Sequence, residues 1–143
     1  IESKRVVGHI MFDLFPRKGK YSHMACWGLL PGKLSTFRGN EYEAPVSVIV
    51  GNFPKGSVKN PSLLSLGEVE TMFHEFGHMM HGVLSRAEFE GQSGTSVDFD
   101  FVEMPSQLFE NWAKDESIFD NDFNDYFGCL AFPSGFLGYV VHR

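Results

Sequence analysis

Two histidines and a glutamate stand at a spacing that can hold and use a metal ion. Residues 74–78 read HEFGH, an H-E-x-x-H sequence inside a strongly helical pattern. At about 100° per residue, His74 and His78 differ by roughly 40° around the axis and one turn along it, so both imidazoles reach one tetrahedral ion. Glu75 points to the side of that ion, where its carboxylate takes a proton from water that zinc has acidified to a pKa of about 7. The pattern predicts a zinc site with Glu75 as the general base.

The third ligand can be sought on the same helix first. An H-E-x-x-H-x-x-G-x-x-H site needs glycine at position 81 and histidine at 84, but this chain has His81 and Leu84. His81 shares the helix face of His74 and His78, yet it lies about 10 Å along the axis from His74, too far to bind the same ion. We interpret His81 as a packing residue or as one that orients a ligand.

A carboxylate from a second helix is the remaining scheme. Glu103 begins that helix, and the 24 residues between His78 and Glu103 allow the two helices to pack side by side. Glu103 would complete a His-His-Glu site with one position open for water. Glu110, seven residues on and on about the same face, is the alternative ligand, and we favour Glu103. Ser106 and Glu110 would then orient the ligands from behind.

The helices that must position these residues are predicted from local signals. Ser65 and Glu68 form an S-x-x-E capping box, which predicts a helix over residues 66–84. A second helix is expected over residues 102–114, with Pro105 in its first turn. The expected apolar positions are Val69, Phe73, Phe76, Met80 and Val83 on the first helix, and Leu108, Phe109 and Trp112 on the second.

Two strands complete the predicted elements. Residues 8–15 and 44–53 are rich in branched and aromatic side chains and are bounded by turn-forming residues. Residues 21–30 are too mixed to assign, and residues 88–95 have the glycine-rich, polar composition of a loop. The chain is therefore expected to be an α+β protein, mainly α, with a small sheet beside a helix pair of the zincin type.

Composition excludes several other classes of function. The fractions of hydrophobic residues (43%) and charged residues (21%) are those of a globular domain, and 143 residues suit a single domain. A net charge of -6 argues against nucleic-acid binding, and the basic run at residues 17–20 is expected to be a solvated loop. No apolar stretch is long enough for a membrane span. Cys26 and Cys129 are expected to stay reduced, so we expect a cytoplasmic protein, or one of a mitochondrial or other organellar matrix.

Four stretches of this sequence, taken together, resemble one family. They are residues 12–23 (FDLFPRKGKYSH), 61–64 (PSLL), 73–81 (FHEFGHMMH) and 93–112, which includes DFVEMPSQ at 100–107. The chain resembles the zinc metallopeptidases of the thimet oligopeptidase, neurolysin, oligopeptidase A and peptidyl-dipeptidase group. That resemblance implies one zinc ion per chain held by His74, His78 and Glu103, with Glu75 as the base. It also implies short peptide substrates and a deep channel in a larger, mostly helical fold.

The resemblance has two limits. Asp98 and Phe99 are unusual before the third ligand, and residues 118–143 are not matched to the family. We therefore interpret residues 1–143 as a single, partial metallopeptidase catalytic domain, whose partners include short peptides and the N- and C-terminal parts of a longer chain. The resemblance implies that the family's tyrosines and histidine that stabilise the oxyanion lie outside this chain. The alternative function is a catalytically impaired zinc-binding fragment or interaction module.

Overall fold

A computed structural model describes residues 6–35, 37, 39, 41–57, 62–115 and 137–142. Its α-helices are α1 (Leu66–Leu84) and α2 (Phe99–Glu110), and its strands are β1 (Val6–Asp13), β2 (Ala25–Leu30), β3 (Lys33–Ser35), β4 (Glu41–Glu43), β5 (Val46–Val50) and β6 (Leu137–His142). Two 3₁₀ turns cover Glu90–Gln92 and Asn111–Lys114. Strands and α-helices contain similar numbers of the described residues, so the fold class is α+β. The expected excess of helix is not a feature of these residues.

The main sheet has four strands in the order β2-β5-β1-β6. β1 and β5 run parallel, with His9 opposite Val46 and Asp13 opposite Val50. Both predicted strands therefore exist. Each ends earlier than predicted, because the pairing between β1 and β5 stops at Asp13 and Val50. β2 lies in the segment that the sequence left unassigned, and it pairs antiparallel with β5 at one edge of the sheet. A separate hairpin joins β3 and β4.

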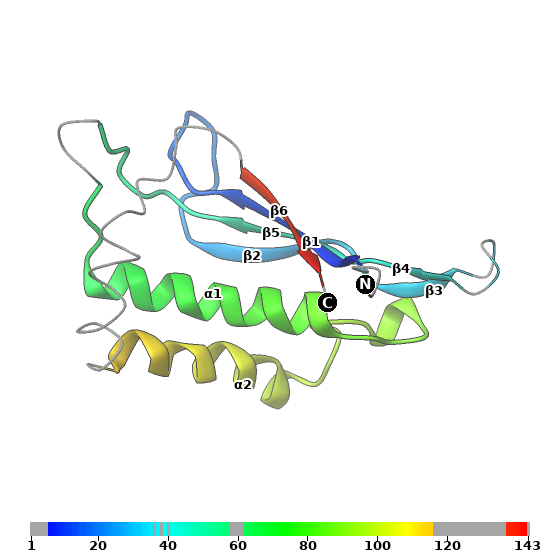
Figure 1. Cartoon of the computed structure of the whole chain (residues 1–143). Coiled ribbons are helices and arrows are strands. Elements are labelled where there is room, and N and C mark those ends of the chain that lie inside the picture. The colour runs from blue at the N-terminus through cyan, green and yellow to red at the C-terminus, as the bar shows by residue number, and fades with distance from the viewer. Residues whose placement is uncertain are drawn as a thin grey trace.

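Helix α1 has the predicted bounds, because its N-terminus carries a complete capping box. The hydroxyl of Ser65 accepts from the backbone N–H of Glu68, and the Glu68 carboxylate accepts from the backbone N–H of Ser65. The helix lies between the sheet and α2 (Figure 1). Its fully buried side chains are Met79 and Val83, which join Ile10, Leu14, Ile49 and Phe53 in the core. The predicted stripe missed Met79, since a helix covered on two sides buries a wider face than one stripe.

Helix α2 begins three residues earlier than predicted. The carbonyl of Asp98 accepts from the N–H groups of Phe101 and Val102, so the first turn forms before Glu103. Pro105 consequently lies inside the helix instead of in its first turn. Of the predicted apolar face, Phe109 packs against Phe76 of α1, with ring centroids 5.8 Å apart. Leu108 and Trp112 of that face are more than half exposed, so they contribute little to the packing of α2 on α1.

A glycine lets the two helices approach closely. A Cβ atom at Gly77 of α1 would lie 2.6 Å from the Cα of Ser106 and 2.7 Å from the carbonyl oxygen of Pro105. Real Cβ atoms do not come this close to backbone atoms, so only glycine fits. The backbones of α1 and α2 therefore touch one turn away from His74 and beside Ser106.

The basic run at residues 17–20 is only partly solvated. The Lys20 side chain is 2% exposed, and its ammonium group donates to the carbonyls of Asp13, Phe15 and Gly51 and to the Asp13 carboxylate. Arg17 is exposed and donates to both carboxylate oxygens of Asp13 at 2.7 Å. Lys20 thus satisfies the carbonyls where β1 and β5 end, and this part of the run serves the fold.

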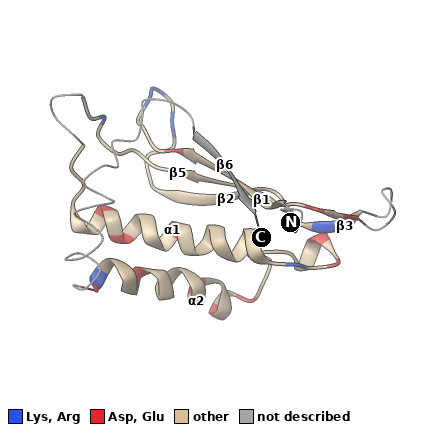
Figure 2. Ribbon diagram, in the orientation of Figure 1, with Lys and Arg blue, Asp and Glu red and all other residues tan. Residues whose placement is uncertain are grey.

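The structure bears on the expectations drawn from charge, hydropathy and cysteine content. The described lysines and arginines lie mainly on loops, on β3 and at the end of α2 (Figure 2). Among the described residues, neither helix combines the length and apolar character of a membrane span. The expectation that Cys129 stays reduced lies outside the described residues, whereas Cys26 is a free cysteine.

Candidate metal centre

Helices α1 and α2 bring three of the predicted residues together. The Nε2 atoms of His74 and His78 lie 3.3 Å and 3.2 Å from Oε2 of Glu103. One ligand atom from each residue lies within 4.8 Å of the other two, and among the described residues this is the group able to hold a metal ion. The i, i+4 spacing on α1 places the two imidazoles on one face, and the contact at Gly77 sets Glu103 opposite them.

These distances fit the donor set of a zinc site. Two atoms bound at about 2.0–2.1 Å to a tetrahedral ion lie about 3.3–3.4 Å apart, close to the separations between Glu103 and each histidine. Two imidazole nitrogens and one carboxylate oxygen are also the donors found in zinc sites that keep one position open for water. The donor types and the two separations from Glu103 therefore fit a zinc ion.

Two further residues of α2 hold the candidate ligands in place. Oε1 of Glu110 lies 2.7 Å from Nδ1 of His74, so the ring presents Nε2 to the centre. Ser106 is fully buried, and its hydroxyl donates to Oε2 of Glu103 at 2.7 Å. Glu110 contacts Nδ1 of His74, on the side of the ring away from the centre, and is not in the three-residue group. Nδ1 of His78 has no such partner among the described residues.

The hydrogen bond that Glu110 accepts from His74 also affects the pKa of Glu110. The contact with His74 is the largest influence and lowers the pKa of Glu110 below its usual value, with Lys114 adding to the effect. A carboxylate that stays ionised is a good acceptor for the Nδ1–H of His74.

Glu75 lies beside the sheet edge. Its Oε2 accepts from the backbone N–H of Cys26 in β2 at 2.7 Å, and Glu75 is not in the three-residue ligand group. The sequence could not indicate this contact, because a backbone N–H carries no side-chain signature. Burial, followed by the charge of Glu75, raises the pKa of the Cys26 thiol to about 12, so the thiol is neutral near pH 7.

His81 packs one turn further along α1. Its ring lies 5.9 Å from that of Phe101, and its Nδ1 is buried without a hydrogen-bond partner among the described residues. Burial, and then the charge of His78, lowers the pKa of His81. The interpretation of His81 as a packing residue agrees with this placement.

The comparison with known proteins identifies the family. A model described as "Peptidase family M3" matches residues 1–131. The "Thimet-like oligopeptidase" of Dictyostelium discoideum is 44% identical over 126 residues, which are 88% of this chain and 18% of that protein. "Saccharolysin" of Saccharomyces cerevisiae is 42% identical over 122 residues, 82% of this chain and 17% of that protein. The chain therefore belongs to peptidase family M3, which confirms the resemblance seen in its motifs.

The extent of these matches matters for function. The "Mitochondrial intermediate peptidase, mitochondrial" of Arabidopsis thaliana is 41% identical over 109 residues, 76% of this chain and 15% of that protein. The chain thus spans less than a fifth of each of these relatives. The family match also runs to residue 131, beyond the point where the motifs stop resembling the family.

Proposed function

We propose that this chain carries the metal centre of a zinc-dependent metallopeptidase that hydrolyses peptide bonds in short peptides. The observation that supports it best is the group formed by His74, His78 and Glu103, whose ligand atoms lie within 4.8 Å of one another. One zinc ion per chain is expected there. Membership of a peptidase family and the helix pair that presents an H-E-x-x-H sequence opposite a downstream glutamate support the same assignment.

The chain's own residues can be given separate roles. When bound, zinc would supply the Lewis acidity that acidifies water and polarises the peptide carbonyl. We assign Glu75 as the general base: its Oε2 is held by the amide of Cys26, and Oε1 takes the proton from the attacking water. The same carboxyl then gives that proton to the leaving amine as the C–N bond breaks. Glu110 and Ser106 keep His74 and Glu103 oriented throughout.

Substrate, partners and compartment follow from the relatives. The relatives named as oligopeptidases support short peptides as substrates. Several relatives are named as mitochondrial, which supports an organellar matrix as the alternative to the cytoplasm. The remaining parts of a longer peptidase are proposed partners, because the relatives are much longer than this chain. The alternative is a catalytically impaired zinc-binding fragment or interaction module, which that same difference in length supports.

Zinc content and turnover, measured on the same preparations, test the proposal. The chain should bind one equivalent of zinc, and His74→Ala or His78→Ala should abolish stoichiometric binding, because two ligands do not hold a catalytic ion. Glu75→Gln should keep the zinc and lose hydrolysis of a quenched fluorescent peptide. Unchanged zinc in the histidine variants would contradict the ligand assignment, and loss of zinc from Glu75→Gln would contradict the role of the base. Full zinc with no turnover by the unaltered chain would favour the alternative.

A further inference from the structure

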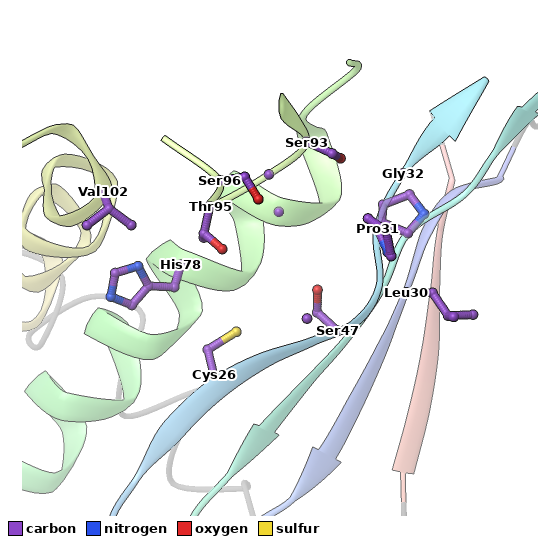
Figure 3. A pocket seen from close by; sticks show the side chains of 14 residues that line it. Cys26, Leu30, Pro31, Gly32, Ser47, His78, Ser93, Thr95, Ser96 and Val102 are labelled. Atoms are coloured by element: carbon purple, nitrogen blue, oxygen red, sulfur yellow. The ribbon is translucent and has the colours of Figure 1, made fainter. Parts of the chain in front are cut away.

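A cavity of about 380 Å³ lies next to the metal centre, between β2, the C-terminal half of α1 and the loop at residues 93–96 (Figure 3). Two residues connect it to the proposed chemistry. His78 lines the cavity and also belongs to the ligand group. Cys26 lines the cavity, and its backbone N–H holds Glu75. A peptide whose scissile carbonyl lay at the metal would therefore have a neighbouring side chain within reach of this cavity.

The cavity is kept open by residues without side chains. Gly28 of β2 has no heavy atom within 4 Å of the position where a Cβ would stand. Gly82 of α1 faces Ser47 of β5, and a Cβ there would lie 3.4 Å from the Ser47 hydroxyl. Gly94 has a φ of +59°, which favours glycine, and its N–H donates to the hydroxyl of Ser85 at 3.0 Å. The last contact fixes the loop over the C-terminal half of α1, so the space at Gly28 and Gly82 is covered but not filled.

The lining is uncharged. Among the described residues that line the cavity there is no lysine, arginine, aspartate or glutamate. The Cys26 thiol stays neutral near pH 7. The apolar side chains that line the cavity are those of Leu30, Pro31, Pro45 and Val102. Hydroxyl groups of Ser47, Ser93, Thr95 and Ser96 line the cavity, but no described residue of the lining carries a charge that could pair with a lysine or a carboxylate. A charged side chain placed here would lose its hydration without gaining an ion pair, whereas an uncharged one would gain from burial.

We propose that this cavity is a specificity subsite which takes one uncharged side chain, up to the size of leucine or phenylalanine, from a residue beside the scissile bond. Gly28 sets its depth. This inference rests on the proposed function, because it needs a peptide anchored at the metal. Cys26 and Gly28 are two positions apart on β2 and point to the same face of the strand, so a side chain added at 28 enters the space beside the Cys26 thiol.

The test uses binding, so it does not depend on turnover. Hydroxamates anchor at a zinc ion, and we would titrate glycine, leucine, lysine and glutamate hydroxamates into the zinc-loaded chain by calorimetry. One probe series carries the side chain on the acyl side of the chelating group, and the other series carries it on the amine side. In one of the two series, leucine should bind at least about tenfold more tightly than glycine, since burial of a branched side chain is worth this much. Lysine and glutamate should bind no more tightly than glycine.

The variant Gly28→Val then fills the cavity. Valine suits a strand and its Cβ meets no heavy atom within 4 Å at this position, so the fold and the zinc content should be kept. The glycine probe should bind as before, and leucine should lose its advantage. Gly91→Val is the matched control: its Cβ also meets nothing within 4 Å, but Gly91 does not line the cavity, so the preference for leucine should remain.

The outcomes separate the subsite from the proposed function. Equal binding of the glycine and leucine probes in both series, or a preference for leucine that survives Gly28→Val, would overturn the subsite while leaving the metal centre intact. Failure of the unaltered chain to hold zinc, or to bind any hydroxamate, would overturn the metal centre and the subsite together.

Discussion

At the scale of single residues, the candidate centre depends on which side of His74 each carboxylate occupies. Glu103 lies 3.3 Å from Nε2 of His74, and Glu110 lies 2.7 Å from Nδ1 of the same ring. One glutamate is therefore placed to bind the ion, and the other to orient the imidazole that binds it. Both belong to α2, so sequence spacing alone left them as alternatives.

Because Glu103 and Glu110 contact different nitrogens of His74, their removal should weaken zinc binding to different degrees. Glu103→Ala should abolish stoichiometric zinc binding, because only two ligands remain. Glu110→Ala should weaken the affinity by about 10 to 100-fold, which is the usual effect of losing a residue that orients a ligand. Competition with a chelator of known affinity measures both, and Glu90→Ala, an exposed glutamate outside the centre, serves as the control. A larger loss in Glu110→Ala than in Glu103→Ala would exchange the two roles.

At the scale of elements, the centre requires that α1 and α2 be in backbone contact. Gly77→Ala puts a Cβ 2.6 Å from the Cα of Ser106, and a backbone atom cannot yield as a side chain does. We expect this variant to push the helices apart, to lose about 2–3 kcal/mol of unfolding free energy and to bind zinc more weakly, since Glu103 moves with α2.

The same helix provides the matched control for that prediction. Gly67 also lies in α1, but a Cβ there meets nothing within 4 Å. Gly67→Ala should therefore stabilise the chain by about 0.5–1 kcal/mol, through helix propensity alone, and leave zinc affinity unchanged. Chemical denaturation and zinc titration of the two variants make the comparison. Similar behaviour of both would show that close contact at Gly77 does not hold the centre.

The ends of β1 and β5 give a prediction about pH. Burial raises the pKa of Asp13, but hydrogen bonds from Arg17 and Lys20 outweigh it, so the pKa lies below its usual value of 3.8. A lowered pKa contributes stability that is present above the usual value and is lost as pH falls through the folded-state pKa. Thermal unfolding between pH 7 and pH 3 should show Asp13→Asn to be less stable at pH 7, with a shallower acid decline.

A variant with the same charge change elsewhere controls that measurement. Asp98→Asn removes one carboxylate outside this cluster and should leave the steepness of the acid decline unchanged. An identical acid decline in Asp13→Asn and the unaltered chain would mean that the contacts of Asp13 with Arg17 and Lys20 contribute no stability that depends on pH.

At the scale of the whole molecule, α2 and the 3₁₀ turn that follows it present an apolar surface. Phe101, Met104, Leu108 and Trp112 recur at helical spacing, and each is between 45% and 59% exposed in the described structure. Exposed apolar stripes of this kind promote association. Side chains exposed to this extent are accessible to a second copy of the chain.

We therefore predict that the isolated chain self-associates through this stripe. The double variant Met104→Gln, Leu108→Gln should lower the weight-average mass in sedimentation and keep zinc binding, because neither side chain belongs to the ligand group. Leu63→Gln changes an exposed leucine outside the stripe and should leave association unchanged. A chain that is monomeric at high concentration without these substitutions would refute the prediction.

Much of the centre was determined by the sequence itself. Contacts between residues three and four positions apart determine the bounds of α1, its capping box and the shared face of His74 and His78. Such contacts depend on the local sequence alone, so they can be predicted without the fold. The sequence favoured Glu103 over Glu110 as the third ligand, and in the structure it is Glu103 whose carboxylate joins His74 and His78 in the group that could hold a metal ion.

The tertiary structure alone decided the rest. Strand order, the place of β2 at the sheet edge and the burial of Lys20 depend on pairing between distant segments, and the alternation within one strand does not specify its partner. The hydrogen bond from the Cys26 amide to Glu75 and the close contact at Gly77 involve backbone atoms. The cavity at Gly28 depends on the absence of a side chain. A sequence pattern records side-chain types, so features made by the backbone become visible only when the chain is folded.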